Sequence, residues 1–271
     1  MDHTLHTAPL PAHPHDIALY VTHLGSKLKT STIRSHLSAV AFFHQIHGFE
    51  NPTSSFLIKK LLAGHRRRER HTPGRKPVTI KLLGQLLSAL RSGNFSPFQR
   101  KLFRAIFTLM YHAALRASEI CVTPNACHAL TASDIAVIPC KQGEALKISF
   151  KTYKHSPKQP KPMIIYPTHS QTCAVRAYKL YARPQAQRDG PAFLTTLGRP
   201  LTRQLLSGVL RDLLTSLHIK ASAYNTHSFR IGKATDMATQ GYSHAQIALL
   251  GRWKSNAFLQ YIRPTVIHGT R

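Results

Sequence analysis

Six residues spread along the chain have the side-chain chemistry needed to break a phosphodiester bond without a metal ion. That reaction requires a nucleophile, cations that stabilise the non-bridging oxygens, and a proton donor for the leaving oxygen. A tyrosine hydroxyl, two guanidinium groups, an ammonium, an imidazole and an indole N–H could supply these functions. The six candidates are Arg116, Lys151, His227, Arg230, Trp253 and Tyr261.

Two of the candidates are paired at helical spacing, which is stronger support than either residue alone. His227 and Arg230 occur in His-Ser-Phe-Arg-Ile-Gly, about one helical turn apart and therefore on one face of a helix. We expect this pair to hold a phosphate, with an imidazole of near-neutral pKa that accepts the proton of an attacking hydroxyl. Arg116, in Ala-Leu-Arg-Ala-Ser-Glu, would add a second guanidinium group that can hold two phosphate oxygens, and Glu119 would orient it. A single arginine at a helix end more commonly interacts with the helix dipole.

A lysine at the end of a strand is the candidate proton donor. Apolar residues alternate at Leu146, Ile148 and Phe150, which predicts a strand that ends in Ser-Phe-Lys-Thr-Tyr-Lys-His. The ammonium of Lys151 could then project from a basic hairpin into a cleft. Surface lysines are common, and three neighbours are alternatives: Lys154, Lys158 and Lys161.

The last two candidates lie close together near the C-terminus. Trp253, the only tryptophan, can donate its indole N–H to a phosphate oxygen, or it can be an ordinary core residue. Tyr261 is expected two turns into a short helix that begins at Ser255, on the same side as Phe258. A phenol with a pKa of about 10 is a poor nucleophile unless nearby cations stabilise the phenolate. The function of Tyr261 therefore depends on the other candidates.

In this order and at these separations, the six residues resemble the catalytic signature of the tyrosine recombinases, the phage-integrase family. His-Ser-Phe-Arg-Ile-Gly and Gly-Arg-Trp-Lys-Ser are most similar to recombinases of eukaryotic mobile elements of the Crypton and DIRS-like kinds. The resemblance implies a site-specific recombinase or integrase whose Tyr261 attacks a phosphate, forming a 3′-phosphotyrosyl bond and freeing a 5′-hydroxyl without ATP or metal. In that family the lysine general acid lies on a β-hairpin, and Lys-Thr directly after the strand makes Lys151 the best match.

The resemblance covers nearly the whole chain and implies two domains that clamp a duplex. Residues 1–72 would form a helical, SAM-like core-binding domain, shortened at its start, and residues 73–271 the catalytic domain. The expected partner is double-stranded DNA, bound by a homo-tetramer. Only ten residues follow Tyr261, whereas relatives often dock a longer tail on a neighbouring protomer. Tyr261 also lies one residue nearer to Trp253 than in bacterial relatives, which leaves the register of its helix open.

The hydrophobic pattern predicts a mainly α fold with a small β-sheet, of the α+β class, with the strands between 135 and 166. The clearest early helix spans 31–47, with Thr30 or Ser31 as its N-cap. Ser96, before a proline, begins another helix, and the chain after 166 is expected to be helical. The expected apolar helix faces are Leu102, Phe103, Ile106, Phe107 and Met110, and Leu205, Leu206, Val209, Leu210, Leu213, Leu214 and Leu217.

A basic segment, residues 65–77, is expected to link the two domains. Its charge density and its Pro and Gly content argue against a buried element. A solvated charge run is the simpler interpretation, but a hinge with this many cations is also suited to lie against phosphates. The expected DNA contacts in and beside this segment are Arg66, Arg67, Arg68, Arg70, Arg75 and Lys76.

The whole chain is strongly basic. Its 37 Lys and Arg against 10 Asp and Glu give a formal charge of +27. This favours a polyanionic partner, and DNA fits because each neutralised phosphate releases condensed counterion. Charge alone leaves a ribosomal or other RNA-binding protein open. The scarcity of carboxylates, with no evident ligand grouping, argues against a two-metal nuclease or transposase.

Cysteine spacing and hydropathy favour a reduced, intracellular protein. The four cysteines show no C-x-x-C pattern, and a zinc site at Cys121, Cys127 and His128 has little support. No apolar run approaches the roughly 18 residues of a membrane span, and the N-terminus has no signal-peptide core. We expect no cofactor and no membrane partner, and a location in the nucleus if the source is eukaryotic or in the cytoplasm otherwise.

Two rival functions stay open. A non-catalytic DNA-binding protein derived from such a recombinase would keep the fold, although a decayed site should have lost at least one of the six groups. A type IB topoisomerase would use the same chemistry to relax a single duplex.

Overall fold

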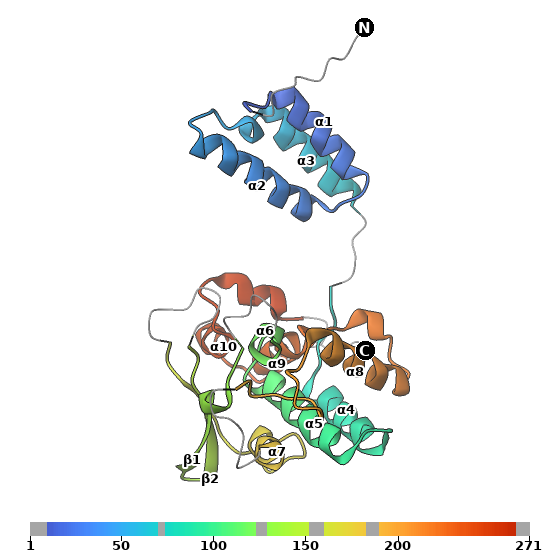
Figure 1. The fold of residues 1–271 in the computed structure, drawn as a ribbon, viewed down its shortest axis with the longest axis vertical. Coiled ribbons are helices and arrows are strands. Elements are labelled where there is room, and N and C mark those ends of the chain that lie inside the picture. The colour runs from blue at the N-terminus through green and yellow to red at the C-terminus, as the bar shows by residue number, and fades with distance from the viewer. Residues whose placement is uncertain (1–9, 70–73, 123–128, 152–159, 183–189, 264–271) are drawn as a thin grey trace. The chain divides into compact units, whose positions relative to one another are not determined.

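The computed structural model describes residues 10–69, 74–122, 129–151, 160–182 and 190–263. The chain divides into two compact units, Met1–Pro73 and Gly74–Arg271, and each has a hydrophobic core of its own (Figure 1). The mainly α fold with one small antiparallel sheet confirms the predicted class. Across the described ranges, no helix is both long enough and apolar enough to cross a membrane.

Over residues 10–69, the N-terminal unit is a small bundle of three α-helices: α1 (Pro14–Gly25), α2 (Thr30–Ile46) and α3 (Phe56–Arg68), with a 3-10 turn, η1, at Pro52–Ser54. The predicted helix over 31–47 is confirmed, but its predicted cap is wrong. Lys29 is the N-cap and makes no side-chain cap. The carboxylate of Glu69 instead accepts the Thr30 N–H, and its contacts with the side chain and the backbone of Thr30 lower the pKa of Glu69. A residue distant in sequence therefore replaces the local cap. The buried core residues are Ile17, Val21, Ile33, Leu37, Ile58 and Leu62.

The predicted linker starts too early, because His65 to Arg68 form the last turn of α3. Cations at this position interact favourably with the C-terminal end of the helix dipole, and an exposed helix tolerates their charge. Arg66, Arg67 and Arg68 are all exposed there, as a DNA contact requires. Arg70 lies outside the described residues.

The end of the predicted linker belongs to the C-terminal unit. The backbone N–H of Lys76 donates to the Ala223 carbonyl at 2.8 Å, and the Arg75 guanidinium donates to the Ser222 carbonyl. Val78 continues this pairing with Ser228 at 2.9 Å. Arg75 and Lys76 are exposed but anchored through these contacts.

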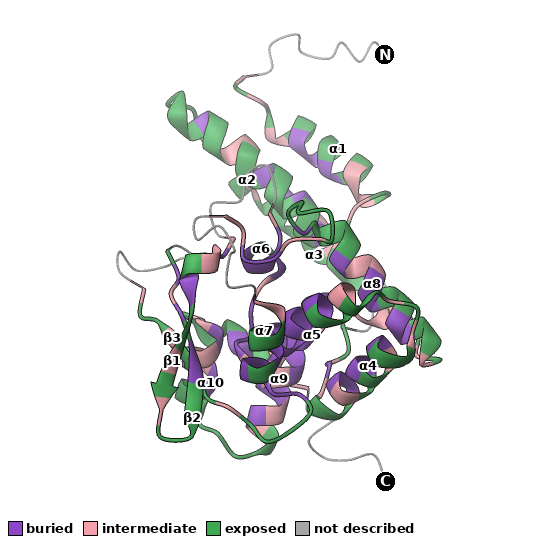
Figure 2. Ribbon diagram, turned by 60° about the horizontal axis from the view of Figure 1, so that its bottom comes forward, coloured by how far each residue is buried: buried purple, intermediate pink, exposed green. Residues whose placement is uncertain are grey.

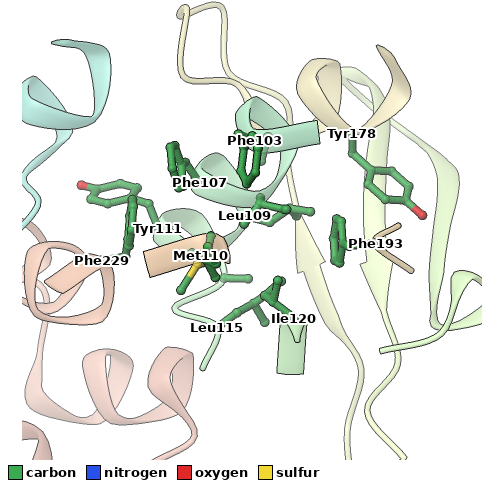
Figure 3. Close-up of a cluster of buried hydrophobic side chains, with 14 of the residues drawn as sticks. Phe103, Phe107, Leu109, Met110, Tyr111, Leu115, Ile120, Tyr178, Phe193 and Phe229 are labelled. Atoms are coloured by element: carbon green, nitrogen blue, oxygen red, sulfur yellow. The ribbon is translucent and has the colours of Figure 1, made fainter. Parts of the chain in front are cut away.

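The C-terminal unit is built around α5 (Pro97–His112), which begins with a capping box between Ser96 and Gln99. The predicted N-cap at Ser96 and the predicted buried face of α5 are both confirmed. Phe107 stacks on Phe229 with ring centroids 5.3 Å apart, which joins α5 to α9 across the core (Figure 3). Figure 2 shows α5 and α9 as largely buried elements. The helix α9 spans Ser228–Thr239, and around it and α5 lie α4 (Ile80–Ser92), α7 (Ala174–Tyr181) and α8 (Arg203–Ser216).

The predicted face of α8 is buried at all but its two ends. Leu205 is exposed, and Leu217, the C-cap, is half-buried. The remaining short elements of this unit are α6 (Ala117–Ile120), α10 (His244–Gly251), and the 3-10 helices η2 (Ala132–Asp134), η3 (Ala221–Ala223) and η4 (Asn256–Tyr261).

The sheet has three antiparallel strands in the order β1 (Ile135–Cys140), β2 (Gly143–Ile148) and β3 (Met163–Ile165). Ile135 pairs with Ile148, and Leu146 pairs with Ile165. The prediction of strands between 135 and 166 is therefore confirmed.

The prediction that everything after 166 is helical is wrong. Residues 190–200 form two isolated β-bridges, Thr131 to Pro191 and Leu194 to Pro200. The two prolines and a left-handed glycine, Gly198 at φ 70°, are incompatible with a helix here.

Candidate functional site

A sharp turn after α5 places Arg116 beside a buried carboxylate. Ala114 adopts a left-handed conformation, with φ 45°, and Arg116 then begins α6. The Arg116 guanidinium donates to Oε1 of Glu119 at 3.0 Å, and its backbone N–H donates to Oε2 at 2.8 Å. Glu119 is fully buried. The predicted role of Glu119 in orienting Arg116 therefore has direct geometric support.

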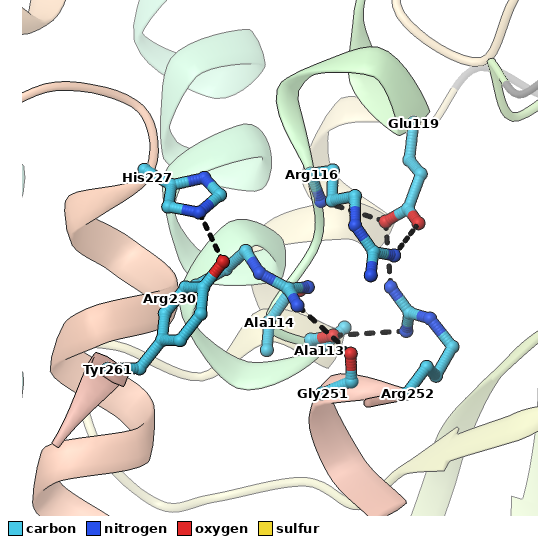
Figure 4. A network of polar contacts seen from close by, with 9 residues as sticks. All are labelled: Ala113, Ala114, Arg116, Glu119, His227, Arg230, Gly251, Arg252 and Tyr261. Atoms are coloured by element: carbon cyan, nitrogen blue, oxygen red, sulfur yellow. Dashed lines mark hydrogen bonds and ion pairs between the residues drawn. The ribbon is translucent and has the colours of Figure 1, made fainter. Parts of the chain in front are cut away.

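Arg252 is a site residue that the sequence reasoning missed. Its guanidinium donates to Oε2 of Glu119 at 2.7 Å, so one carboxylate lies between Arg252 and Arg116 (Figure 4). Arg252 has a left-handed backbone, φ 55°, and its guanidinium lies 4.1 Å above the ring of Phe150. The only signal in the sequence was its place between Gly251 and Trp253, because its partner Glu119 is far away in the chain.

Arg230 is the most enclosed cation of the site. It is fully buried on α9, and its two terminal nitrogens donate to the carbonyls of Ala114 and Gly251. Its guanidinium also lies 4.6 Å from the centroid of Trp253 and 5.6 Å from that of Tyr261, which favours the charged form. Burial lowers the pKa of Arg230 to about 10, so the group stays cationic at neutral pH. Its Nε is buried and has no hydrogen-bond partner among the described residues.

His227 and Tyr261 are in direct contact. His227 is the N-cap of α9, and its backbone N–H donates to the Asn225 side chain at 2.9 Å. Its Nε2 lies 2.5 Å from the hydroxyl of Tyr261 (Figure 4). In the tautomer that is protonated on Nδ1, Nε2 accepts the hydroxyl proton.

The near-neutral pKa predicted for His227 is wrong. Burial, followed by the charges of Arg230, Arg116 and Arg203, lowers the pKa of His227 to about 4. The imidazole is therefore neutral at pH 7 and able to accept a proton. A phosphate bound among the arginines would offset their charge and raise this pKa.

The segment that carries Tyr261 is held against α9. Ser255 caps it as predicted, but η4 is a 3-10 helix, and its three residues per turn align Phe258 with Tyr261. The Thr235 hydroxyl on α9 donates to the Tyr261 carbonyl at 3.2 Å, and Phe258 is buried below. These contacts position the phenol beside His227.

Trp253 packs directly against the phenol, with ring centroids 4.8 Å apart. A Cβ at Gly251 would lie 1.7 Å from the Trp253 ring, so only glycine fits at the end of α10. The indole N–H donates to no protein atom in the described part of the chain. Both roles considered for Trp253, packing and donation to a phosphate, are compatible with this position.

Lys151 is exposed and follows Phe150, whose ring packs on Arg252. This places the backbone of Lys151 near the arginine cluster, but the structure records no contact between Lys151 and the other five candidates. Of its alternatives, Lys154 and Lys158 lie outside the described residues, and Lys161 is exposed. The structure thus brings together Arg116, His227, Arg230, Trp253 and Tyr261 and leaves the choice of lysine a prediction.

The assembled site has more positive than negative charge. Arg116, Arg230 and Arg252 surround one carboxylate, Glu119, which makes the site suited to an anion such as a phosphate diester. Within the described ranges, no three His, Cys, Asp or Glu side chains are grouped to hold a metal ion. Two of the residues considered for zinc, Cys127 and His128, fall outside these ranges.

Sequence and structure comparisons converge on one family. Residues 81–264 match the sequence profile of the phage integrase family. No curated protein sequence matches the chain.

Three solved structures show the same fold. The Tn1549 transposon integrase in complex with circular intermediate DNA has a TM-score of 0.60 at 13% identity, covering 93% of this chain and 81% of that one. XerH site-specific recombinase bound to palindromic difH substrate has a TM-score of 0.65 at 11% sequence identity, and the match covers 95% of this chain and 70% of that one. A lambda integrase dimer bound to a COC′ core site has a TM-score of 0.58 at 16% sequence identity, and the match covers 98% of this chain and 68% of that one.

Proposed function

We propose that this chain, which belongs to the phage integrase family of tyrosine recombinases, cleaves and rejoins duplex DNA with Tyr261 as its nucleophile. The observation that carries the proposal is the 2.5 Å contact between the Tyr261 hydroxyl and a neutral His227 inside a cluster of arginines. A neutral imidazole can accept the phenol proton, and the arginines favour the phenolate that results.

Each step then has a donor and an acceptor within this chain. The Tyr261 oxygen forms a bond to phosphorus, its proton passes to Nε2 of His227, and the bond from phosphorus to the 5′-oxygen breaks. Lys151 protonates that 5′-oxygen. Arg116 and the free Nε of Arg230 donate to the non-bridging oxygens. In the reverse sequence, a 5′-hydroxyl attacks the phosphotyrosyl bond and releases Tyr261, so no energy source is consumed.

The decisive experiment traps the covalent adduct. A nicked suicide duplex, which loses a short 5′-hydroxyl fragment after cleavage, should leave wild-type protein attached to DNA on a denaturing gel. Tyr261→Phe keeps the ring and should retain fold and duplex affinity within about 1.5 kcal/mol, the cost of a hydrogen bond. The variant should form no adduct. An adduct that persists in Tyr261→Phe, or its loss in EDTA with recovery in Mg²⁺, would refute the mechanism.

The role of Lys151 needs its own test, because the structure does not single it out. Lys151→Ala should slow cleavage of an ordinary substrate. A substrate with sulfur in place of the bridging 5′-oxygen should restore the rate, because a thiolate leaves without protonation. Lys161→Ala is the matched control and should cleave both substrates normally. If Lys161→Ala instead cleaves the ordinary substrate slowly and the sulfur-containing substrate at the normal rate, the general acid is Lys161.

The proposal extends to binding, assembly and origin. Exposed Arg66, Arg67 and Arg68, together with Arg75 and Lys76, are proposed to contact phosphates of the core duplex, as is Arg70. Duplex affinity should therefore fall steeply and log-linearly with salt concentration. Charge reversal at Arg66 to Arg68 should weaken binding equally for all DNA sequences.

We further propose a homo-tetramer on DNA, an origin in a eukaryotic mobile element and a nuclear location.

One observation favours a second candidate, a DNA-binding protein without catalysis. Arg230 is fully buried, two of its nitrogens already bind protein carbonyls, and the Tyr261 ring lies over its guanidinium. Because Arg230 has no exposed surface, a phosphate can reach it only if the side chains that cover it move. Wild-type protein that binds a suitable nicked site tightly but forms no adduct would favour this candidate. Relaxation of a supercoiled plasmid by a monomer would instead favour the hypothesis that the protein is a type IB topoisomerase.

A further inference from the structure

A second basic region lies on the C-terminal unit, along α4 and the first half of α5. It consists of two hollows that share Arg91. The larger, of about 660 Å³, is lined mainly by one face of α4, including Lys81, Gln85 and Ser88. The smaller, of about 130 Å³, lies among α4, α5 and α7 and has leucines between its cations. We call the two together the α4–α5 groove. Its cations are Lys81, Arg91, Arg100, Lys101 and Arg104.

The residues that line the groove define what it can bind. None of them is an Asp or a Glu, so the groove does not suit a metal ion or a basic peptide. None is aromatic, so bases of a single strand have no ring on which to stack. Hydroxyl and amide side chains stand beside the cations, and these are the groups that contact the phosphates and sugars of a duplex.

Arg104 shows that the cations of the groove repel one another. Its guanidinium donates to the Gln171 carbonyl at 2.7 Å, and Arg176 donates to the adjacent Ser170 carbonyl at 3.0 Å. Burial and the charges of Arg176 and Arg91 lower the pKa of Arg104. Its Nε is buried and has no partner among the described residues. An anion at this point would relieve the repulsion and satisfy the free N–H.

The α4–α5 groove is separate from the candidate catalytic site. Arg100 lies in the first turn of α5, whereas the site begins after the helix ends at His112. Twelve residues of helix separate these positions by about 18 Å. None of the residues that line the groove belongs to the catalytic cluster.

We propose that the α4–α5 groove binds the phosphate backbone of a second segment of duplex DNA while the first segment occupies the catalytic site. This inference rests on the proposed function for the choice of DNA among polyanions. One chain would then hold two duplexes, which would keep a second duplex near the complex before any strand is exchanged.

The test counts short duplexes per chain. The groove variant carries Arg91→Gln, Arg100→Gln and Lys101→Gln, all exposed positions. The matched control carries Lys141→Gln, Arg199→Gln and Lys220→Gln, which are exposed and line neither hollow. Full-length protein is titrated with a fluorescent duplex of about 12 base pairs at low salt. Adduct formation on the nicked substrate is measured in parallel.

We expect wild-type protein and the control to bind two duplexes per chain and the groove variant to bind one. The affinity for the second duplex should fall at least tenfold in the groove variant. The slope of log affinity against log salt concentration should become shallower by about 2 to 3. Adduct formation should change less than threefold. One duplex per chain in the wild type, or two in the groove variant, would overturn the inference. So would a groove variant that loses adduct formation, because the groove would then hold the first duplex. Absence of adduct in the wild type alone would count only against the catalytic proposal.

Discussion

The two ends of α5 carry arginines in opposite settings. At the C-terminal end, Arg116 and Arg252 share the buried carboxylate of Glu119, and Arg230 is fixed by main-chain carbonyls. In the N-terminal half, Arg100 and Arg104 each donate to one main-chain carbonyl, face other cations, and have no carboxylate in the groove lining. The C-terminal end has a fixed geometry with its charge partly balanced, whereas the N-terminal half has excess charge, an exposed Arg100 and a half-buried Arg104.

This difference separates two tasks that cations perform on DNA. Catalysis requires donors fixed in advance at the oxygens where charge develops. Backbone binding needs only charge near phosphates, and it tolerates movement of the side chains. Substitutions that preserve charge but alter shape should therefore be severe at the C-terminal end and mild at the N-terminal end.

The largest effect should come from Arg230→Lys. Lysine keeps the charge but cannot span the carbonyls of Ala114 and Gly251 and also present a third donor. Adduct formation should slow by a factor on the order of 100 or more, as when a preorganised donor is lost. Single-turnover cleavage of the nicked duplex measures the rate. The control is Arg100→Lys at the other end of α5, which should cleave normally. Equal cleavage rates for Arg230→Lys and wild type would mean that cleavage does not need the guanidinium group of Arg230.

Glu119→Gln tests whether the carboxylate positions the arginines. The amide keeps one acceptor oxygen for Arg116 or Arg252 but not two, and it removes the only charge between them. We expect about a tenfold slower cleavage and an unfolding free energy lower by about 2 kcal/mol, as for a buried hydrogen-bonded ion that loses its partner. Urea denaturation gives the stability. A variant that is less stable but cleaves at the wild-type rate would limit Glu119 to a structural role.

Local patterns made part of this arrangement predictable. The Ser96 cap, the buried stripe of α5 and the alternation in β2 each follow from a few neighbouring residues. The approach of His227 to Tyr261 was accessible only through the resemblance to a family, because these residues are 34 positions apart.

What escaped prediction depends on contacts distant in sequence. Arg252 acquires its role from Glu119, and the N-terminus of α2 is satisfied by Glu69, the residue that follows α3. The pKa of His227 was misjudged because burial depends on the assembled core. The α4–α5 groove also needs the fold, since its cations come from separate helices.

The titration of His227 gives a pH test that the groove arginines cannot mimic. Its pKa is about 4 in the folded protein against 6.5 for the ordinary side chain. Between these values the unfolded chain binds more protons, so the unfolding free energy rises with pH from about 4 to 6.5 and levels off above. The rise should be about 2 kcal/mol after allowance for partial exposure. Urea denaturation from pH 4.5 to 7.5 measures it. His227→Gln should lose its part of this rise in stability with pH. The rise due to His112 should remain, because burial also lowers the pKa of His112 to about 4.

The smallest effect compares two helix caps, one at each end of this arrangement. Ser96 begins α5 beside the groove, and Ser243 begins α10, which leads to Arg252 and Trp253; both form capping boxes with a glutamine. Ser96→Ala and Ser243→Ala should each lower the unfolding free energy by about 1 kcal/mol. Only Ser243→Ala should also slow adduct formation, by a few-fold, because α10 ends at residues that contact Arg230 and Tyr261. Thermal denaturation and single-turnover cleavage measure the two effects. If Ser96→Ala slows cleavage as much as Ser243→Ala, α5 transmits the disturbance along its length, and its two ends are not independent.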